Sequence, residues 1–214
     1  MNAPRLHRTA DEISGRIDEM AEELADWVDV DTVVVGVLKG CLPFMADLVR
    51  RFPVPVEIDF LALSPFVPDS GRVRLTRDLS IDVTGRSVLL VEGVVDTGFR
   101  LDYLRRHLAS HGADEVKVCT LFDRADRRVL PMDLDHVGFD TGASFLVGFG
   151  LDHRGEFRNL PAVVEVDLAE LDRGGSEMVT VVRNTGRARA HHWGFGVQSR
   201  PLTAPTNPSD GSRR

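Results

Sequence analysis

Charged and hydroxyl side chains follow three apolar segments of the sequence. The first group is Lys39-Gly40, the second is Glu92 with the turn Asp96-Thr97-Gly98, and the third is Asp152 with Arg158. In open α/β sheets, ligands bind beyond the carboxyl ends of the strands. We therefore expect the three groups to converge on one site, provided that the apolar segments are strands.

The turn Asp96-Thr97-Gly98 has the composition of an anion-binding turn between a strand and a helix. Free backbone N–H groups at a helix start bind anions, and a glycine lets a phosphate approach closely. The carboxylates of Glu92 and Asp96 would repel that phosphate unless they accept hydrogen bonds from sugar hydroxyls or bind Mg²⁺. This combination favours a phosphorylated sugar as the ligand.

The elements that would position these groups alternate between strand and helix. The β-branched run from Thr32 to Leu38 and the run Ser87–Val91 predict strands buried on both faces. We interpret Glu92 to Gly98 as the turn after the second run. Helical spacing predicts helices at Thr9–Trp27, with a Thr9–Glu12 capping box, at Pro43–Arg51 and at Phe99–His111.

Further strands and one loop complete the pattern. The expected strands are Val54–Leu63, Arg72–Arg77, Glu115–Phe122, Asp135–Phe139 and Phe145–Phe149, and the expected loop is Pro65–Ser70. The alternation of strand and helix predicts an α/β fold with a mostly parallel central sheet flanked by helices.

The last part of the chain differs in composition from the rest. Residues 173–214 carry seven arginines against two acidic residues. We expect a C-terminal extension there, with a hairpin at 179–196 around Asn184-Thr185-Gly186 and a disordered basic tail at 200–214.

Composition excludes several classes of protein. Two cysteines among 214 residues are too few for a disulfide scaffold, and no apolar run approaches the ~20 residues that span a bilayer. The first residues lack the apolar core of a secretory signal, which predicts a cytoplasmic protein. The net charge of −7 argues against nucleic acid as the main partner.

Taken in order, the motifs resemble those of the type I phosphoribosyltransferases, and within them the hypoxanthine-guanine branch. The resemblance spans about residues 5 to 165. It rests on Val35–Gly40, Ala46–Arg50, Val88–Gly98, Val118–Leu121, Val137–Phe139, Phe145–Asp152 and Phe157–Pro161. It implies the fold of that family with a small hood subdomain, and it makes residues 1–172 the phosphoribosyltransferase domain.

The resemblance implies transfer of 5-phosphoribose from phosphoribosyl pyrophosphate to a purine base, with release of pyrophosphate. By this resemblance Lys39, Gly40 and Arg158 would bind pyrophosphate, with a cis peptide bond before Lys39. Glu92 would bind the ribose hydroxyls, and Asp96 would act as general acid or base at the purine N7. The ribose and its 5′-phosphate would be bound by Asp96, Thr97, Gly98, Phe99 and Arg100, with Thr97 to Arg100 around the phosphate.

The same resemblance implies how the base and a metal are bound. Arg124 would contact the 6-oxo group of the base, Phe145 would stack on the ring, and the Leu146 backbone would contact its edge. Asp152, with Glu92, would bind Mg²⁺, which offsets charge on the leaving group. The family also implies a homo-oligomer.

Four positions depart from the family pattern. Gly93 replaces the second acid of the Glu-Asp pair, Arg100 replaces a small hydroxyl residue, and Arg124-Ala125 replaces a lysine and a proline. The segment Ser64–Gly71 is shorter than the family's mobile loop, and two prolines stiffen it. These departures leave two alternatives open, a non-purine acceptor in a specialised pathway or a non-catalytic regulator that binds phosphoribosyl pyrophosphate or a nucleotide.

Other interpretations of single residues stay open from the sequence alone. Lys39 is also typical of a solvated surface lysine, Asp152 of a turn cap and Phe145 of a core residue. Cys41 and Cys119 have the context of small buried hydrophobic residues. The adjacent pair His191-His192 points to opposite faces of a strand, which disfavours a metal site there.

Overall fold

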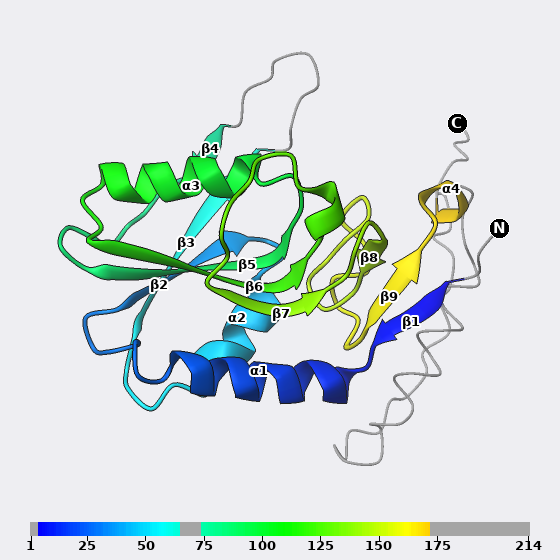
Figure 1. Cartoon of the computed structure of the whole chain (residues 1–214), viewed down its shortest axis with the longest axis horizontal. Coiled ribbons are helices and arrows are strands. Elements are labelled where there is room, and N and C mark those ends of the chain that lie inside the picture. Colours follow the sequence, from blue (N-terminus) through cyan, green and yellow to red (C-terminus); the bar gives the residue numbers. More distant parts are fainter. Residues whose placement is uncertain (1–3, 65–73, 172–214) are drawn as a thin grey trace, which may run out of the picture.

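The main feature of the structure, a computed structural model that describes residues 4–64 and 74–171, is a six-stranded sheet with helices on both faces (Figure 1). The strand order is β4-β3-β2-β5-β6-β7, and every neighbouring pair is parallel except β3 and β4. The strands are β2 (Val33–Leu38), β3 (Glu57–Leu63), β4 (Leu75–Arg77), β5 (Ser87–Val95), β6 (Glu115–Asp123) and β7 (His136–Asp140). The predicted mostly parallel α/β sheet is therefore confirmed.

Alternation along the strands divides the core into two layers. Val34 and Leu89 face α1 (Ala10–Leu24) and α2 (Leu42–Val49), while Val33 and Leu90 face α3 (Phe99–Ser110). Figure 1 shows α3 on one side of the sheet and α1 and α2 on the other. The predicted capping box is present at the start of α1, where Thr9 and Glu12 bond to each other's backbone N–H groups.

One predicted turn is wrong, because β5 continues through Val95 and does not end at Val91. Glu92 pairs with Thr120 of β6, and Val94 and Val95 pair with its last two residues. The long partner strand supplies backbone hydrogen bonds along this stretch, and these override the turn tendency of Gly93.

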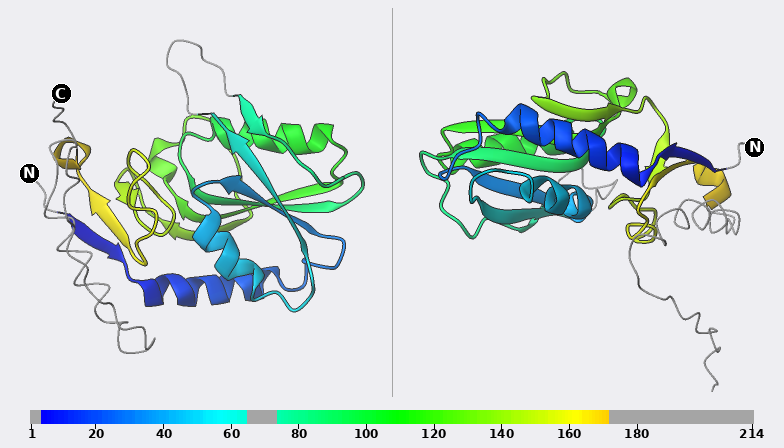
Figure 2. Two further views of the ribbon diagram at one scale, coloured as in Figure 1. Left: turned by 180° about the vertical axis from the view of Figure 1, so that it is seen from behind. Right: turned by 90° about the horizontal axis from the view of Figure 1, so that it is seen from below.

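A second, antiparallel sheet forms a small hood at one end of the molecule (Figure 2). Its strands are β1 (Arg5–Arg8), β9 (Val163–Val166) and β8 (Phe145–Val147), in that order. The sequence did not predict β1 or β9. Asp152 and Arg158 follow β8, so they belong to the hood and not, as expected, to an edge of the parallel sheet.

Short elements complete the described chain, namely the 3₁₀ turn η1 (Ala125–Arg127) and α4 (Leu168–Leu171). Several expectations fall outside the described residues: the loop Pro65–Ser70, the start of the strand expected at Arg72–Arg77, the hairpin 179–196 and the tail 200–214. Within the described ranges, none of the helices has the length and apolar character that crossing a membrane requires.

Candidate active site

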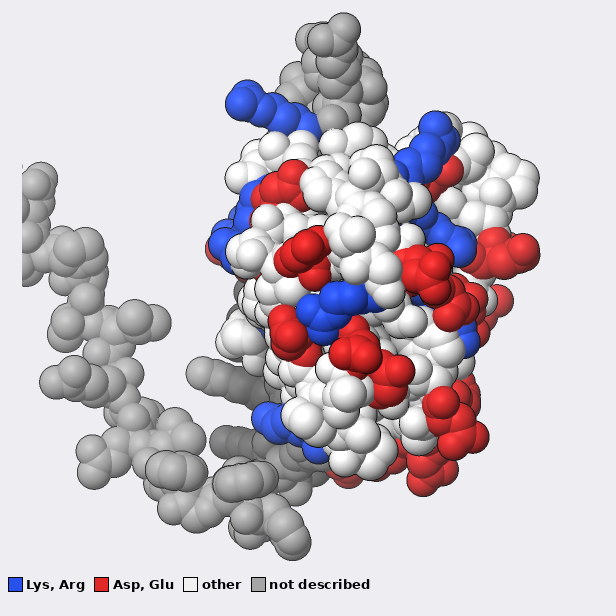
Figure 3. Space-filling view, turned by 90° about the vertical axis from the view of Figure 1, so that its left-hand side faces the viewer, with Lys and Arg blue, Asp and Glu red and all other residues white. Residues whose placement is uncertain are grey.

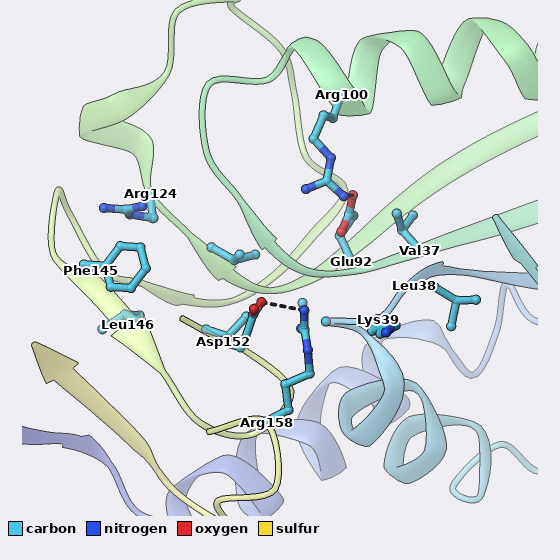
Figure 4. A pocket seen from close by; sticks show the side chains of 14 residues that line it. Val37, Leu38, Lys39, Glu92, Arg100, Arg124, Phe145, Leu146, Asp152 and Arg158 are labelled. Atoms are coloured by element: carbon cyan, nitrogen blue, oxygen red, sulfur yellow. Dashed lines mark ion pairs between the residues drawn. The ribbon is translucent and has the colours of Figure 1, made fainter. Parts of the chain in front are cut away.

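An open cleft lies between the central sheet and the hood (Figure 4). The cleft is lined by Val37–Gly40, Glu92–Val94, Arg100, Arg124, Phe145, Leu146, Leu151, Asp152 and Arg158. Each of the three groups of site residues expected from the sequence therefore contributes at least one residue to this cleft.

Lys39 and Gly40 follow β2, and glycines on two other segments pack against the Gly40 carbonyl. The Leu38–Lys39 peptide bond is cis, as expected. A Cβ at position 93 would lie 2.7 Å from the Gly40 carbonyl oxygen, and a Cβ at position 150 would overlap the same oxygen. Gly93 is thus explained by packing, because a side chain there would displace the Lys39-Gly40 loop.

Asp152 and Arg158 form an ion pair in the middle of the cleft (Figure 4). Their nearest nitrogen and oxygen are 2.5 Å apart. Arg158 also donates to the Gly150 carbonyl at 2.6 Å, and Asp152 accepts from the Gly155 N–H at 2.7 Å. Both side chains are therefore held in place with a cation and an anion presented side by side.

Glu92 is a buried carboxyl group on the wall formed by β5. Burial raises its pKa to about 7, while the Arg100 guanidinium and the Gly93 N–H oppose this shift. The ion-pair distance to Arg100 is 3.9 Å, and Figure 4 shows the two side chains pointing toward each other. Near neutral pH, small changes around Glu92 therefore decide whether it is charged.

Arg124, Phe145 and Leu146 form the end of the cleft that lies away from Lys39 (Figure 4). The guanidinium carbon of Arg124 lies 5.9 Å from the centre of the Phe145 ring, and Arg124 donates to the Ala143 carbonyl at 2.7 Å. Its Nε is buried and has no acceptor among the described residues. An aromatic face beside a donor-rich side chain suits a flat heterocycle with carbonyl groups.

Asp96 does not line the cleft, although it contacts a residue that does. Its carboxylate accepts from Arg127 Nε at 2.8 Å and lies 3.6 Å from an Arg124 nitrogen. Arg127 was not predicted as a site residue, because nothing in its local sequence indicates that its side chain contacts a residue 31 positions earlier. Asp96 is thus placed where it orients Arg124.

The turn after Asp96 is covered by a later segment of the chain. The Thr97 carbonyl accepts from the Val129 and Leu130 N–H groups, each at 3.1 Å. Gly98 has a φ of +92° and directly precedes α3, and Phe99 is exposed. Of the five residues from Asp96 to Arg100, expected to bind the ribose and its 5′-phosphate, only Arg100 lines the cleft.

The two cysteines behave as the sequence indicates. Both are buried free thiols. Burial, with a smaller contribution from the nearby Glu92 charge, raises the pKa of Cys41 to about 12, and burial raises that of Cys119 as well. Neither thiol is a nucleophile at neutral pH.

The carboxylates of the cleft fit a hard divalent cation. Mg²⁺ usually binds proteins through one or two carboxylates and completes its shell with water and substrate phosphates. Glu92 and Asp152 supply two such groups from opposite sides of the cleft. A cation there would also favour the ionised form of Glu92.

Comparisons with known proteins agree with this geometry. Residues 9–154 match the family model of the phosphoribosyl transferase domain. A hypoxanthine-guanine phosphoribosyltransferase of Streptococcus agalactiae is 41% identical over 146 residues, which cover 67% of this chain and 81% of that protein. One from Mycobacterium avium is 38% identical over 169 residues, 74% of this chain and 83% of that protein.

A solved structure gives the same result for the fold. The crystal structure of a hypoxanthine-guanine phosphoribosyltransferase from Bacillus anthracis superposes with a TM-score of 0.73 and 32% identity, covering 78% of this chain and all of that one. The chain therefore shares its fold, over most of its length, with a solved phosphoribosyltransferase. The chain belongs to the phosphoribosyltransferase family.

Proposed function

We propose that the chain transfers 5-phosphoribose from phosphoribosyl pyrophosphate to hypoxanthine or guanine and releases pyrophosphate. The observation that carries this proposal is the joint presence in one cleft of Lys39 and Arg158 for phosphates, Glu92 for a sugar, and Arg124 with Phe145 for a base. The family of the chain supports the reaction, and its relatives that are named hypoxanthine-guanine phosphoribosyltransferase support hypoxanthine or guanine as the acceptor.

The Asp152–Arg158 pair matches a pyrophosphate group with its metal ion. A guanidinium binds phosphate oxygens in a two-pronged manner, and Lys39 adds a second positive charge at the same end of the cleft. Asp152 presents the opposite charge beside Arg158. We infer that Asp152 and Glu92 hold Mg²⁺. When bound, Mg²⁺ would offset negative charge on the leaving pyrophosphate.

Glu92 is suited to the sugar in the middle of the cleft. As a carboxylate it accepts hydrogen bonds from ribose hydroxyls, which a cationic phosphate-binding residue cannot do. Cleavage of the bond between C1′ and pyrophosphate leaves positive charge on the sugar ring. A buried negative charge stabilises that transition state because the surrounding protein screens it weakly.

Arg124 accounts for the choice of base. A guanidinium only donates hydrogen bonds, so it favours a 6-oxo group, which accepts, over the 6-amino group of adenine, which donates. Phe145 provides the stacking face. We propose that Asp96, which stands behind Arg124 and does not itself line the cleft, accepts the proton from N7 of the incoming base and also positions the Arg124 side chain.

The test is pyrophosphate release from phosphoribosyl pyrophosphate and Mg²⁺ with a panel of bases. We expect turnover with hypoxanthine and guanine, and a rate with adenine lower by roughly 100-fold or more, since the site would leave a donor facing a donor. Arg158→Met should lose most activity, whereas Arg154→Met, in the same loop but outside the cleft, should retain it.

The other outcomes separate the alternatives. Turnover only with a non-purine acceptor would replace the purine proposal by the specialised pathway. Tight binding of phosphoribosyl pyrophosphate without turnover of any acceptor would replace it by a regulatory role. An unaffected Arg158→Met enzyme would contradict the site itself.

Three broader properties of the protein belong to the same proposal. We infer that residues 1–172 form the catalytic domain with 173–214 as an extension, that the protein acts in the cytoplasm, and that it assembles as a homo-oligomer. The resemblance to the family supports the domain and the assembly, and the acidic composition with few cysteines is consistent with the compartment. Light scattering on the full chain measures the assembly directly.

A further inference from the structure

Three side chains of types that bind metals lie together beside the C-terminal end of α3, away from the cleft. His107 and His111 are one helical turn apart at the C-terminal end of α3, and Asp78 follows β4. Each residue offers a ligand atom within 4.8 Å of those of the other two. Because β5 and β6 are parallel, α3 runs back from the cleft, so its end lies at the opposite side of the sheet.

His107 is held by its surroundings in a direction that serves this cluster. Its Nε2 lies 2.6 Å from Asp78 Oδ1, and Tyr103 stacks on its ring with centroids 6.1 Å apart. Only 15% of its side chain is exposed, while 47% of the Asp78 side chain is exposed. Asp78 Oδ1 also accepts from the Leu79 N–H at 2.8 Å, so a rotation of this carboxylate on its fixed backbone is what would widen the contact to the ~3.4 Å that separates two ligands of one tetrahedral ion.

His111 is oriented by the backbone of the same helix. Its Nδ1 lies 2.9 Å from the His107 carbonyl oxygen, and the rings of the two histidines are 4.3 Å apart. An imidazole that donates from Nδ1 to a carbonyl has its lone pair on Nε2. Metal-ligating histidines commonly have their other ring nitrogen fixed by such a bond.

The loop that carries Asp78 is held in place by hydrogen bonds to Asp59. Asp59 of β3 is buried and accepts hydrogen bonds from the N–H groups of Ser80 at 2.6 Å and Ile81 at 3.0 Å. These bonds fix the backbone two residues beyond Asp78. The third ligand is therefore presented by a rigid segment, as preorganised metal sites require.

The charge around the cluster favours a cation. Unpaired carbonyl groups give a helix C-terminus a partial negative charge, and His107 and His111 lie at that end. The face of the molecule away from the hood also carries many Asp and Glu side chains, with fewer Lys and Arg (Figure 3). Such a surface raises the local concentration of cations.

We propose that Asp78, His107 and His111 form a binding site for a divalent transition metal, represented by Zn²⁺, with one position open to water. Two imidazoles and one carboxylate suit Zn²⁺ or its neighbours, whereas Mg²⁺ prefers oxygen ligands alone. The ion would tie the segment after β4 to the end of α3. This site is separate from the cleft and does not depend on the proposed reaction.

The test is Zn²⁺ binding to the full chain, prepared without an affinity tag and stripped with a chelator, in millimolar Mg²⁺ to occupy carboxylate sites. Calorimetry should show one Zn²⁺ per chain, and His107→Ala/His111→Ala should weaken it by more than about tenfold. X-ray absorption should show two nitrogen ligands at about 2.0–2.1 Å.

Matched variants exclude other sources of binding. His191→Gln/His192→Gln changes two histidines that lie outside the described residues, and it should bind Zn²⁺ as the parent does. Asp78→Asn and His111→Ala should each weaken binding. Their melting temperatures without metal show that they fold. Absence of Zn²⁺ binding by the parent, or equal binding by the His107→Ala/His111→Ala variant, would overturn the proposal.

Discussion

At the scale of single residues, Glu92 is a buried group whose charge depends on one neighbour. Its pKa of about 7 lies above the ordinary value for glutamate because of burial, and the Arg100 charge lowers it. Ribose hydroxyls need the ionised carboxylate as acceptor. We expect kcat/KM for phosphoribosyl pyrophosphate to rise with pH as Glu92 ionises, and Mg²⁺ in the site should move the midpoint of this profile below the value of about 7 that burial gives.

The Arg100→Met enzyme distinguishes this titration from that of the substrate. Loss of the positive charge raises the pKa of Glu92 further, so the midpoint of the profile should move to higher pH. Arg106→Met is the matched control, since Arg106 lies on the same helix and pairs with Asp102 instead. Profiles with the same midpoint in all three enzymes would contradict the assignment to Glu92.

Gly93 provides a second prediction at this scale. A Cβ there would lie 2.7 Å and 2.9 Å from the carbonyl oxygen and carbon of Gly40, and backbone cannot move aside cheaply. Gly93→Ala should cost about 1–3 kcal/mol of unfolding free energy. It should also raise KM for phosphoribosyl pyrophosphate, because the Lys39-Gly40 loop moves.

The control for this substitution is Gly15→Ala. Gly15 lies inside α1, and a Cβ at this position would meet no atom of another part of the chain within 4 Å. Alanine should therefore add about 0.5–1 kcal/mol of stability. Urea unfolding and steady-state kinetics measure both effects. Unchanged KM in Gly93→Ala would show that packing against Gly40 does not set the loop position.

The sequence predicted the place of a site residue well where its own motif determines that place. It did so less well where a distant side chain holds the residue. Lys39, Glu92, Asp152 and Arg158 line the cleft as expected. Lys39, Asp152 and Arg158 follow strands, whereas Glu92 lies within β5, beyond the predicted end of that strand. Asp96 differs, because the arginine that binds it comes from η1. No local pattern reports which distant side chain will reach a given carboxylate.

At the scale of elements, Asp59 connects β3 to the segment before β5. Burial alone would raise its pKa, but the N–H groups of Ser80, Phe60 and Ile81 outweigh burial and hold the pKa below its ordinary value. Asp59→Ala would remove the buried carboxylate that accepts from these N–H groups. We expect it to lower the unfolding free energy by about 1–3 kcal/mol at pH 7.

The pH dependence of this loss has a defined sign. A carboxyl group with a lowered pKa stabilises the fold above the pKa of the unfolded chain, and the contribution is lost as pH falls through the folded value. The difference between the parent and Asp59→Ala should therefore shrink below roughly pH 4. Glu57→Ala, exposed on the same strand, should change stability by less than about 0.5 kcal/mol. An equal loss from both substitutions would argue against the buried hydrogen bonds.

Two strands, β1 and β9, were not predicted, because they form by pairing with distant strands and their own composition gives little sign of a strand. β1 and β9 are four residues each and pair across about 160 positions of sequence, with Arg5 opposite Glu165. Short antiparallel strands have no strong periodicity of their own. The longer buried runs of β2 and β6 were predicted to within a residue or two, because burial on both faces demands continuous apolar sequence.

At the scale of the whole molecule, the alternation of strands and helices along the sequence predicted the fold class. It did not predict where the site lies. From the sequence, all three groups of site residues were expected at strand ends of one parallel sheet. The structure instead divides them between that sheet and the hood. Which strands share a sheet is a property of long-range pairing, so it becomes visible only in three dimensions.

The division of the cleft between two sheets has a further consequence. Arg124 and Glu92 belong to the parallel sheet or the turn that follows it, whereas Phe145 and Arg158 come from the hood or its following loop, and no described strand is shared by the two sheets. A nucleotide lying across this boundary would act as a crosslink, joining two hydrogen-bonded units that the backbone ladder leaves separate. Product release would then require the parallel sheet and the hood to move slightly apart. The turnover rate would therefore depend on how stiffly these two units are connected.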